Sequence, residues 1–340
     1  MSSQGPFQAA PIDTAIVRRP GGRLSILRKG GVASSPGRPL PVAKGAVPVN
    51  KKRHSLADDL KAYAFLAPYL SVFVLFTLVP IAFGIYVSLH NWSTTLGNQG
   101  FAGLANYTTL IEGRGYYGSE FYQAMWNTIL FVIISVPLLW AIPTALAYAV
   151  FRSPAKTLWR TLFFYPSVFS VTAFGSAWAL LLATDGGAVN SILHIDIHWL
   201  TSIPDAWWSI DIATIWATMG FAFIIMYAAI TQVPKVTIEA AEIDGAKPFQ
   251  RFRYVILPQL RRASAVVVII ETIASFNLFA QDQIMTGGGP GYDTTTISMN
   301  IYNQAFSSFN IGGATAAAFL LAIILAVIAF VQLRISRRAT

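Results

Sequence analysis

The segment from Glu239 to Pro258 carries the most specific arrangement of chemical groups in this chain. It reads EAAEIDGAKPFQRFRYVILP and separates two long apolar stretches. The small residues Ala240 and Ala241 would let another protein approach closely, and Gly245 is typical of a sharp turn that ends a helix. Charged residues on either side would form ion pairs at the rim of a contact. This combination favours docking of a soluble partner over catalysis.

The elements that must position these groups are expected in the polar loop 232–262. The run from Glu239 to Glu242 favours a helix, Pro248 suits the first turn of a second short helix, and Pro258 lies near its exit. An ordinary solvated amphipathic loop is the alternative, since most charged runs are simply hydrated faces. The predicted docking residues are Glu239, Ala240, Ala241, Asp244, Gly245, Leu257 and Pro258.

A second group of polar residues lies inside the apolar stretch 263–286. Polar groups at membrane depth are costly and normally face the bundle interior or a water-filled path. A polar solute in such a path would need hydrogen-bonding partners together with apolar surfaces, which the neighbouring stretch 210–231 could supply. Glu271 fits such a path and an interhelical hydrogen bond equally well. The path-lining residues predicted from these two stretches are Ser275, Asn277, Gln281, Met219, Gly220 and Phe223.

Other arrangements do not support chemistry within the chain. Gly287–Gly291 lacks the Lys-Ser/Thr ending of a phosphate loop, so we expect no ATP site and no enzyme activity here. His194 and His198 supply only two nearby zinc ligands, so no metal site is predicted. The chain has no cysteine, which excludes thiol catalysis and disulfides.

Composition indicates a polytopic membrane protein. The 340 residues are 54% hydrophobic and 11% charged, whereas a soluble domain has about 25% charged residues. The apolar residues form blocks long enough to cross a bilayer. We therefore predict an all-α fold with six transmembrane helices, near 62–90, 121–150, 158–183, 210–231, 263–286 and 310–334.

The positive charges support an even number of spans. If the N-terminus is cytoplasmic, all 24 Lys and Arg residues except Arg114 fall in segments on the cytoplasmic side. The predicted domains are a disordered basic arm, 1–54, and a transmembrane domain, 55–340. Residues 1–61 contain eleven basic and three acidic residues. Because no aromatic residues alternate with these charges, contact with anionic lipid is favoured over nucleic-acid binding.

The segment at Glu239 resembles the EAA loop of ABC-importer permeases. Glu239-Ala-Ala, Gly245 and Leu257-Pro258 match its pattern, whereas Val255 replaces the usual isoleucine. Over roughly residues 60–335 the chain is also similar to the carbohydrate branch of that family, the maltose-permease-like proteins. The motifs that carry this similarity are Phe101–Tyr107, Asn127-Thr128, Thr286–Pro290, Thr294–Thr296, Tyr302 and Phe306.

The resemblance implies a type I ABC importer permease fold and a role as half of a sugar-conducting pore in the inner cell membrane. It implies four kinds of partner: a second homologous permease, two ATP-binding subunits that use ATP and Mg, an extracytoplasmic solute-binding protein, and the sugar. Family positions near Ser167 and at Leu278 line the translocation site, although Leu278 is apolar here. An ion-gradient-driven secondary transporter and a non-transporting scaffold are the alternatives. The sequence does not specify the sugar.

Overall fold

The computed structural model describes residues 56–338, with side chains described from 63 to 337. The chain divides into two units, Met1–Lys61 and Ala62–Thr340, and the fold below is that of the second unit. The predicted arm 1–54 lies outside the described residues.

The described chain is mostly helical, which confirms the predicted all-α membrane class. A small antiparallel hairpin, β1 (His90–Ser93) with β2 (Gly97–Phe101), was not predicted. Up to the middle of the chain the helices are α1 (Leu56–Phe73), α2 (Val79–Ser88), α3 (Ala105–Ile111), α4 (Gly115–Arg152), α5 (Lys156–Phe164), α6 (Val171–Leu181), α7 (Ala188–Leu193) and α8 (Asp205–Thr231). They continue with α9 (Lys235–Ile243), α10 (Pro248–Gln250), α11 (Leu257–Gln259), α12 (Arg261–Phe276), α13 (Ala280–Met285), α14 (Ile297–Phe306) and α15 (Ile311–Arg338).

Short irregular helical segments join several of these helices. A π-helical segment, Val74–Leu78, links α1 to α2, and a second one, Arg251–Ile256, links α10 to α11. A 3₁₀ segment, Tyr165–Val168, precedes α6. There Pro166 is followed by a 95° bend between the two halves of the predicted third span. Pro137 and Pro143, by contrast, lie inside the uninterrupted helix α4.

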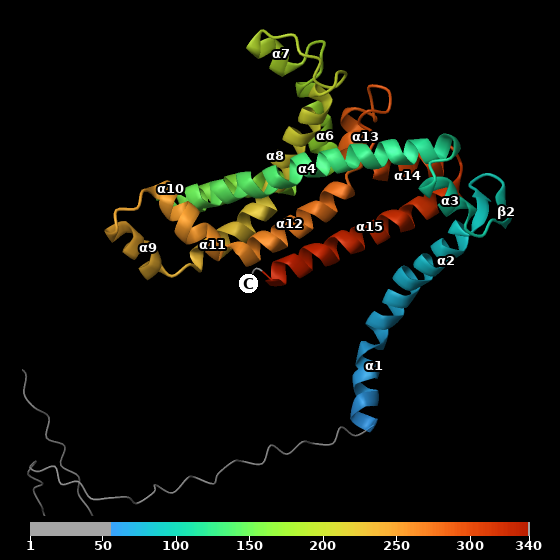
Figure 1. The fold of residues 1–340 in the computed structure, drawn as a ribbon, viewed down its shortest axis with the longest axis horizontal. Coiled ribbons are helices and arrows are strands. Elements are labelled where there is room, and N and C mark those ends of the chain that lie inside the picture. Colours follow the sequence, from blue (N-terminus) through green and yellow to red (C-terminus); the bar gives the residue numbers. More distant parts are fainter. Residues whose placement is uncertain (1–55, 339–340) are drawn as a thin grey trace, which may run out of the picture. The chain divides into compact units, whose positions relative to one another are not determined.

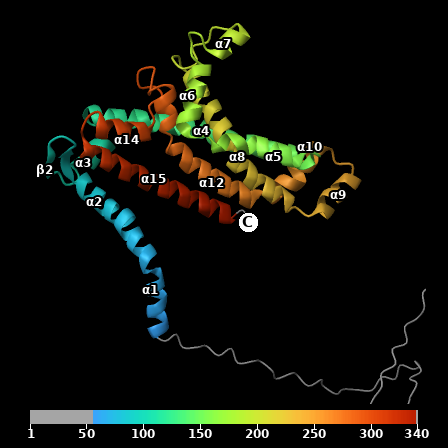
Figure 2. The same ribbon diagram turned by 180° about the vertical axis from the view of Figure 1, so that it is seen from behind.

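The long helices pack along one another. Helix α8 packs against the longer helix α4. Helix α12 packs against both α4 and α15 (Figures 1 and 2). Four apolar clusters fill the spaces between them, and the largest joins α4, α8 and α12 around Phe223, Met226 and Val267. Ser135 of α4 donates a hydrogen bond to the Asp211 carboxylate of α8, so the acidic group in that contact has a partner.

The count of six continuous spans is not reproduced. In the described part of the chain four helices are long and apolar enough to cross a membrane, and the bent pair α5–α6 would make a fifth. The predicted span 263–286 consists of α12 and α13, separated at residues 277–279. Helix α12 has 16 residues and is about 24 Å long, so it is shorter than a bilayer core of about 30 Å.

Side chains from outside the helix explain this break. The carbonyl group of Leu278 accepts a hydrogen bond from Thr296 Oγ1 at 2.7 Å, and that of Phe276 accepts one from Ser298 Oγ at 3.2 Å. Buried Asp282 accepts from the Thr296 backbone N–H at 3.1 Å. The chain can therefore leave the helix without leaving these carbonyl groups unpaired, which would be costly in lipid.

Helix α4 also holds the loop between α13 and α14. Asn127 Nδ2 donates to the carbonyl groups of Tyr292 and Thr295 at 3.0 and 3.1 Å. Thr128 Oγ1 accepts from the backbone N–H of Ile297 at 2.8 Å. Asn127 and Thr128 thus form one hydrogen-bonded cluster with Tyr292, Thr295 and Ile297, which we call the loop clamp.

We expect Asn127→Leu to destabilise the protein by about 1–3 kcal/mol, because it leaves two backbone carbonyl groups without their donor. The measurement is the thermal unfolding midpoint of the purified protein in detergent. Ser308→Ala, a change at an exposed residue of the following loop, is the control. An Asn127 variant as stable as that control would show that the loop clamp contributes nothing to stability.

Candidate coupling loop and substrate path

The predicted docking loop forms two short helices that meet at Gly245. Helix α9 ends in a left-handed turn in which Gly245 has φ +77°. The Gly245 N–H donates to the Glu242 carbonyl at 3.0 Å, and the Ala246 N–H donates to the Ala241 carbonyl at 2.9 Å. This pair of bonds is a Schellman motif, which caps a helix with glycine. The predicted turn and both helices are therefore present.

The second helix of the loop starts at Pro248. Gln250 Oε1 accepts from the Lys247 backbone N–H at 2.7 Å, and the π-helical segment then continues to α11. An ion pair between Arg251 and Glu242 connects this helix to α9. The loop is thus a small closed unit, with a side chain as well as the backbone joining its two arms.

Apolar contacts fasten this unit to the long helices. Val233, Ile256 and Leu260 are buried in the cluster around α8. Tyr148 of α4 donates a hydrogen bond to the Pro248 carbonyl at 2.8 Å. The centre of its ring lies 4.8 Å from the centre of the Phe252 ring. A force on the loop would therefore be passed to α4 and α8 through packed side chains.

The outer face of the loop is exposed. Of the predicted docking residues, Glu239, Ala240, Asp244, Gly245 and Pro258 are exposed, and Ala241 and Leu257 are half-buried. The sequence analysis missed three large apolar side chains on the loop: Val236, Ile243 and Phe249 are 75%, 87% and 73% exposed. Val236 and Ile243 are seven residues apart on α9, which places them on one side of the helix and could have been noticed.

The break between α12 and α13 is where several predicted path residues meet. Ser275 is buried, and its Oγ is one of several buried side-chain atoms without a hydrogen-bond partner. Asn277 is exposed and donates to the Ile273 carbonyl at 2.7 Å. Gln281 is partly exposed on α13, whereas Leu278 is buried beside Phe131 and Ile210. The polar residues at the break therefore differ in accessibility, and Asn277 and Gln281 are the more accessible.

The predicted residues on α8 lie against the bent third span. Gly220 is buried, and a Cβ added there would lie 2.5 Å from Ser167 Oγ and 3.0 Å from the Phe163 carbonyl oxygen. The glycine thus lets the chain around Ser167 pack closely. Phe223 is fully buried, and its ring centre lies 5.5 Å from that of Phe163. Met219 is partly exposed. Ser167 Oγ is buried and has no hydrogen-bond partner.

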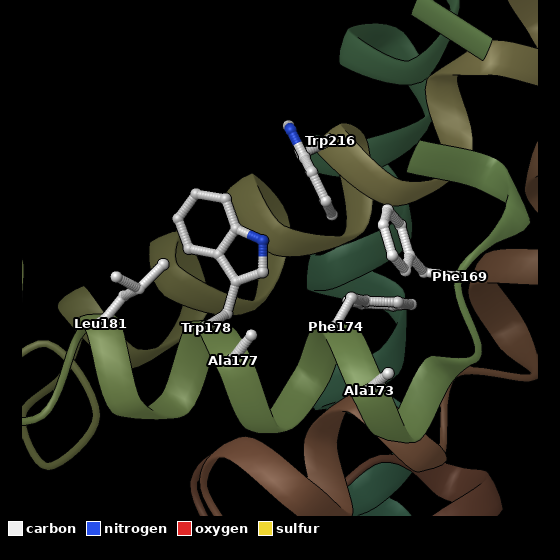
Figure 3. Close-up of a pocket in the computed structure, with 7 residues that line it drawn as sticks. All are labelled: Phe169, Ala173, Phe174, Ala177, Trp178, Leu181 and Trp216. Carbon is white, nitrogen blue, oxygen red and sulfur yellow. The ribbon is translucent and has the colours of Figure 1, made fainter. Parts of the chain in front are cut away.

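A pocket of about 380 Å³ lies beyond the bend of the third span (Figure 3). Aromatic side chains dominate its lining, and sequence analysis did not identify it. Figure 3 shows Trp178 of α6 and Trp216 of α8 beside the opening, with Phe169 on the side of the bend. The residues that line it are Phe169, Ala173, Phe174, Ala177, Trp178, Leu181 and Trp216.

His194 and His198 do not share a helix face, because α7 ends at Leu193. Across the described residues no group of three or more His, Asp or Glu side chains is placed to hold a metal ion. The geometry of the chain is that of a membrane bundle with an exposed docking loop and a broken helix.

Comparison with known proteins agrees with this geometry. The chain is 30% identical over 291 residues to a probable starch degradation products transport system permease protein of Thermoanaerobacterium thermosulfurigenes, covering 85% of this chain and 98% of that protein. It is 31% identical over 290 residues to a sulfoquinovosyl glycerol transport system permease protein of Agrobacterium fabrum (83% and 92%). A trehalose/maltose transport system permease protein of Thermococcus litoralis is 30% identical over 255 residues (74% and 83%).

Among solved structures, a chain of a bacterial ABC transporter involved in the import of the acidic polysaccharide alginate has the same fold, with a TM-score of 0.71 and 23% identity. The match covers 84% of this chain and 97% of that one. A chain of a bacterial alginate ABC transporter in complex with an alginate pentasaccharide-bound periplasmic protein matches equally, with a TM-score of 0.71 and 23% identity. Residues 60–340 match the family profile described as "Binding-protein-dependent transport system inner membrane component". The chain therefore belongs to this family, whose members are the membrane-spanning permease components of ABC importers and not their catalytic subunits.

Proposed function

We propose that this chain forms half of the pore of an ATP-driven importer for a sugar or sugar derivative. The observation that carries the proposal is the exposed loop of α9 and α10, whose apolar face lies outside the bundle. In this proposal the Glu239–Pro258 loop docks on an ATP-binding subunit, which uses ATP and Mg, and two such subunits serve the complex. Val236, Ile243 and Phe249 bury their exposed surface in that contact.

A second homologous permease completes the pore. The first candidate span, Tyr63–Ser88, is the least buried of the four in the described chain, with 6% of its most apolar window inside the fold. Lipid can cover such a helix, and so can a neighbouring subunit. Because one broken helix cannot enclose a path by itself, we infer that the partner permease supplies the opposite wall.

The substrate class rests on the site and on the relatives. Three of the permeases that match this chain are named for starch degradation products, trehalose/maltose and sulfoquinovosyl glycerol. Asn277 and Gln281 offer hydrogen-bonding groups at the helix break, and the pocket at Trp178 and Trp216 offers ring faces. A sugar uses both kinds of surface. An extracytoplasmic solute-binding protein would deliver it at the side opposite the coupling loop, in a cell membrane with both termini cytoplasmic.

A cross-linking experiment tests the docking step. Because the chain has no cysteine, Ile243→Cys introduces a single reactive thiol on α9. We expect it to cross-link to the ATP-binding subunit in the assembled complex. Ile192→Cys on α7, which is 73% exposed, is the control and should give no such product. Equal cross-linking from both positions, or none from Ile243→Cys, would rule out docking through α9.

Substitution at Gly245 tests coupling. A side chain in the left-handed conformation costs about 1–2 kcal/mol, and a β-branched residue is worse. We expect Gly245→Val to lower sugar-stimulated ATP hydrolysis and uptake by at least tenfold in proteoliposomes. Gly245→Asn should retain most of both activities, because asparagine tolerates this conformation and no other atom lies within 4 Å of the added Cβ. Uptake that persists after ATP is removed would favour the ion-gradient alternative.

Substitution at the helix break tests the path. We expect Asn277→Ala to raise the substrate concentration for half-maximal uptake about tenfold, the cost of one lost hydrogen bond to the sugar. Basal ATP hydrolysis should not change. Gln283→Ala, on the exposed side of α13, is the matched control. If uptake is the same in both variants and in the unmodified complex, Asn277 does not line the path.

A further inference from the structure

A groove lies between the start of α12 and the end of α15. Its volume is about 550 Å³, and Trp140 of α4 closes one side. Helices α12 and α15 run side by side, and the end of α15 lies near α11 (Figures 1 and 2). The groove shares Arg253, Leu257 and Pro258 with the proposed coupling loop, and its other lining residues have no part in the proposed coupling or transport steps.

Most of the uncharged lining of the groove is apolar, and Ser264, Gln332 and Ser336 are its uncharged polar members. Ala265, Val268 and Ile269 of α12 face Ile335 of α15 across it. The distance along α12 from Arg261 to Ile269 is about 12 Å, at 1.5 Å per residue. A floor of this shape suits an extended hydrocarbon chain better than a compact polar solute.

The rim of the groove is basic. Arg253 and Arg261 line it, and both side chains are exposed. Within the residues that the structure describes, neither arginine makes a hydrogen bond or an ion pair, whereas nearby Arg251 pairs with Glu242. None of the described residues that line the groove is acidic. The groove thus combines an apolar floor with two guanidinium groups that have no acidic partner among the described residues.

We propose that this groove binds one anionic phospholipid of the leaflet at the coupling-loop end, with Arg253 and Arg261 holding its phosphate. The acyl chain lies along α12, and the bidentate geometry of arginine suits the phosphate oxygens. Basic pockets between membrane helices on the cytoplasmic side commonly bind such head groups.

Other occupants fit the groove less well. A soluble phosphate would use the arginines but leave the apolar floor uncovered. The segment 1–61, which has eleven basic and three acidic residues, would be repelled by the rim. A helix of a partner subunit would cover the floor but would have to bring acidic groups to the two arginines. A lipid satisfies both the floor and the rim with one molecule.

The experiment compares lipid retained by the assembled complex in nanodiscs of phosphatidylcholine with one fifth phosphatidylglycerol. We expect one phosphatidylglycerol per chain to remain bound after detergent extraction, as measured by native mass spectrometry. Arg253→Gln with Arg261→Gln should weaken retention at least tenfold, since each cation near the membrane surface contributes about a factor of five. Arg262→Gln with Arg334→Gln removes the same charge from exposed positions outside the groove and should retain the lipid.

A second variant distinguishes the contribution of the apolar floor to lipid binding from that of the two arginines. Ala265→Trp fills the groove and keeps both arginines, and it should also lose the lipid. If both double variants lose the bound lipid equally, then diffuse surface charge and not the groove holds the lipid, and the proposal is overturned. So would displacement of the bound lipid by excess inorganic phosphate, or a groove that cross-links to a partner subunit and retains no lipid. Correct assembly with the ATP-binding subunits, checked for every variant, keeps a folding defect apart from lost binding.

Discussion

The structure depends on one constraint: every backbone carbonyl group inside the membrane must have a donor. A continuous helix meets this requirement within itself. The chain between α12 and α13 does not, and the hydroxyl groups of Thr296 and Ser298 supply the missing donors. Thr296 is held in turn by Asp282, and the next residue, Ile297, is held by Thr128 of the loop clamp on α4. The broken helix that carries Asn277 and Gln281 thus depends on a loop some twenty residues further along the chain.

This dependence explains which parts of the fold could be predicted. Apolar blocks and the placement of Lys and Arg were enough for the membrane class and for most helix positions, because bilayer thickness sets helix length. The break at residues 277–279 could not be read from the local sequence, since Ser275, Asn277 and Gln281 are also compatible with a continuous polar helix. What ends α12 is a set of hydrogen bonds from residues 296 and 298. Sequence periodicity carries no information about such distant donors.

The same contrast applies to the site. The turn at Gly245 was predictable, because the conformation it adopts strongly favours glycine. Gly220 is a different case: it was predicted to line the path, whereas the space left by its missing side chain is taken by Ser167 and the Phe163 carbonyl group. The close packing at Gly220 still affects the proposed path, because the contact of α8 with the bend fixes where Trp216 and Phe169 lie. The sequence alone does not show which atoms will occupy the space left by a glycine's missing side chain.

The coupling loop and the groove at α12 share the segment from Arg253 to Arg261. That segment connects the exposed apolar face of α9 with the first turn of α12, and α12 leads to the break at Asn277. A displacement of the loop relative to α15 would move Arg253, Leu257 and Pro258 relative to Ile335 and so change the shape of the groove. A lipid in the groove would therefore interact differently with the loop before and after such a displacement. It would favour one position only to the extent of that difference in interaction free energy. Lipid composition and ATP-driven movement would then act on the same short stretch of chain, which lies between the proposed docking surface and the proposed substrate path.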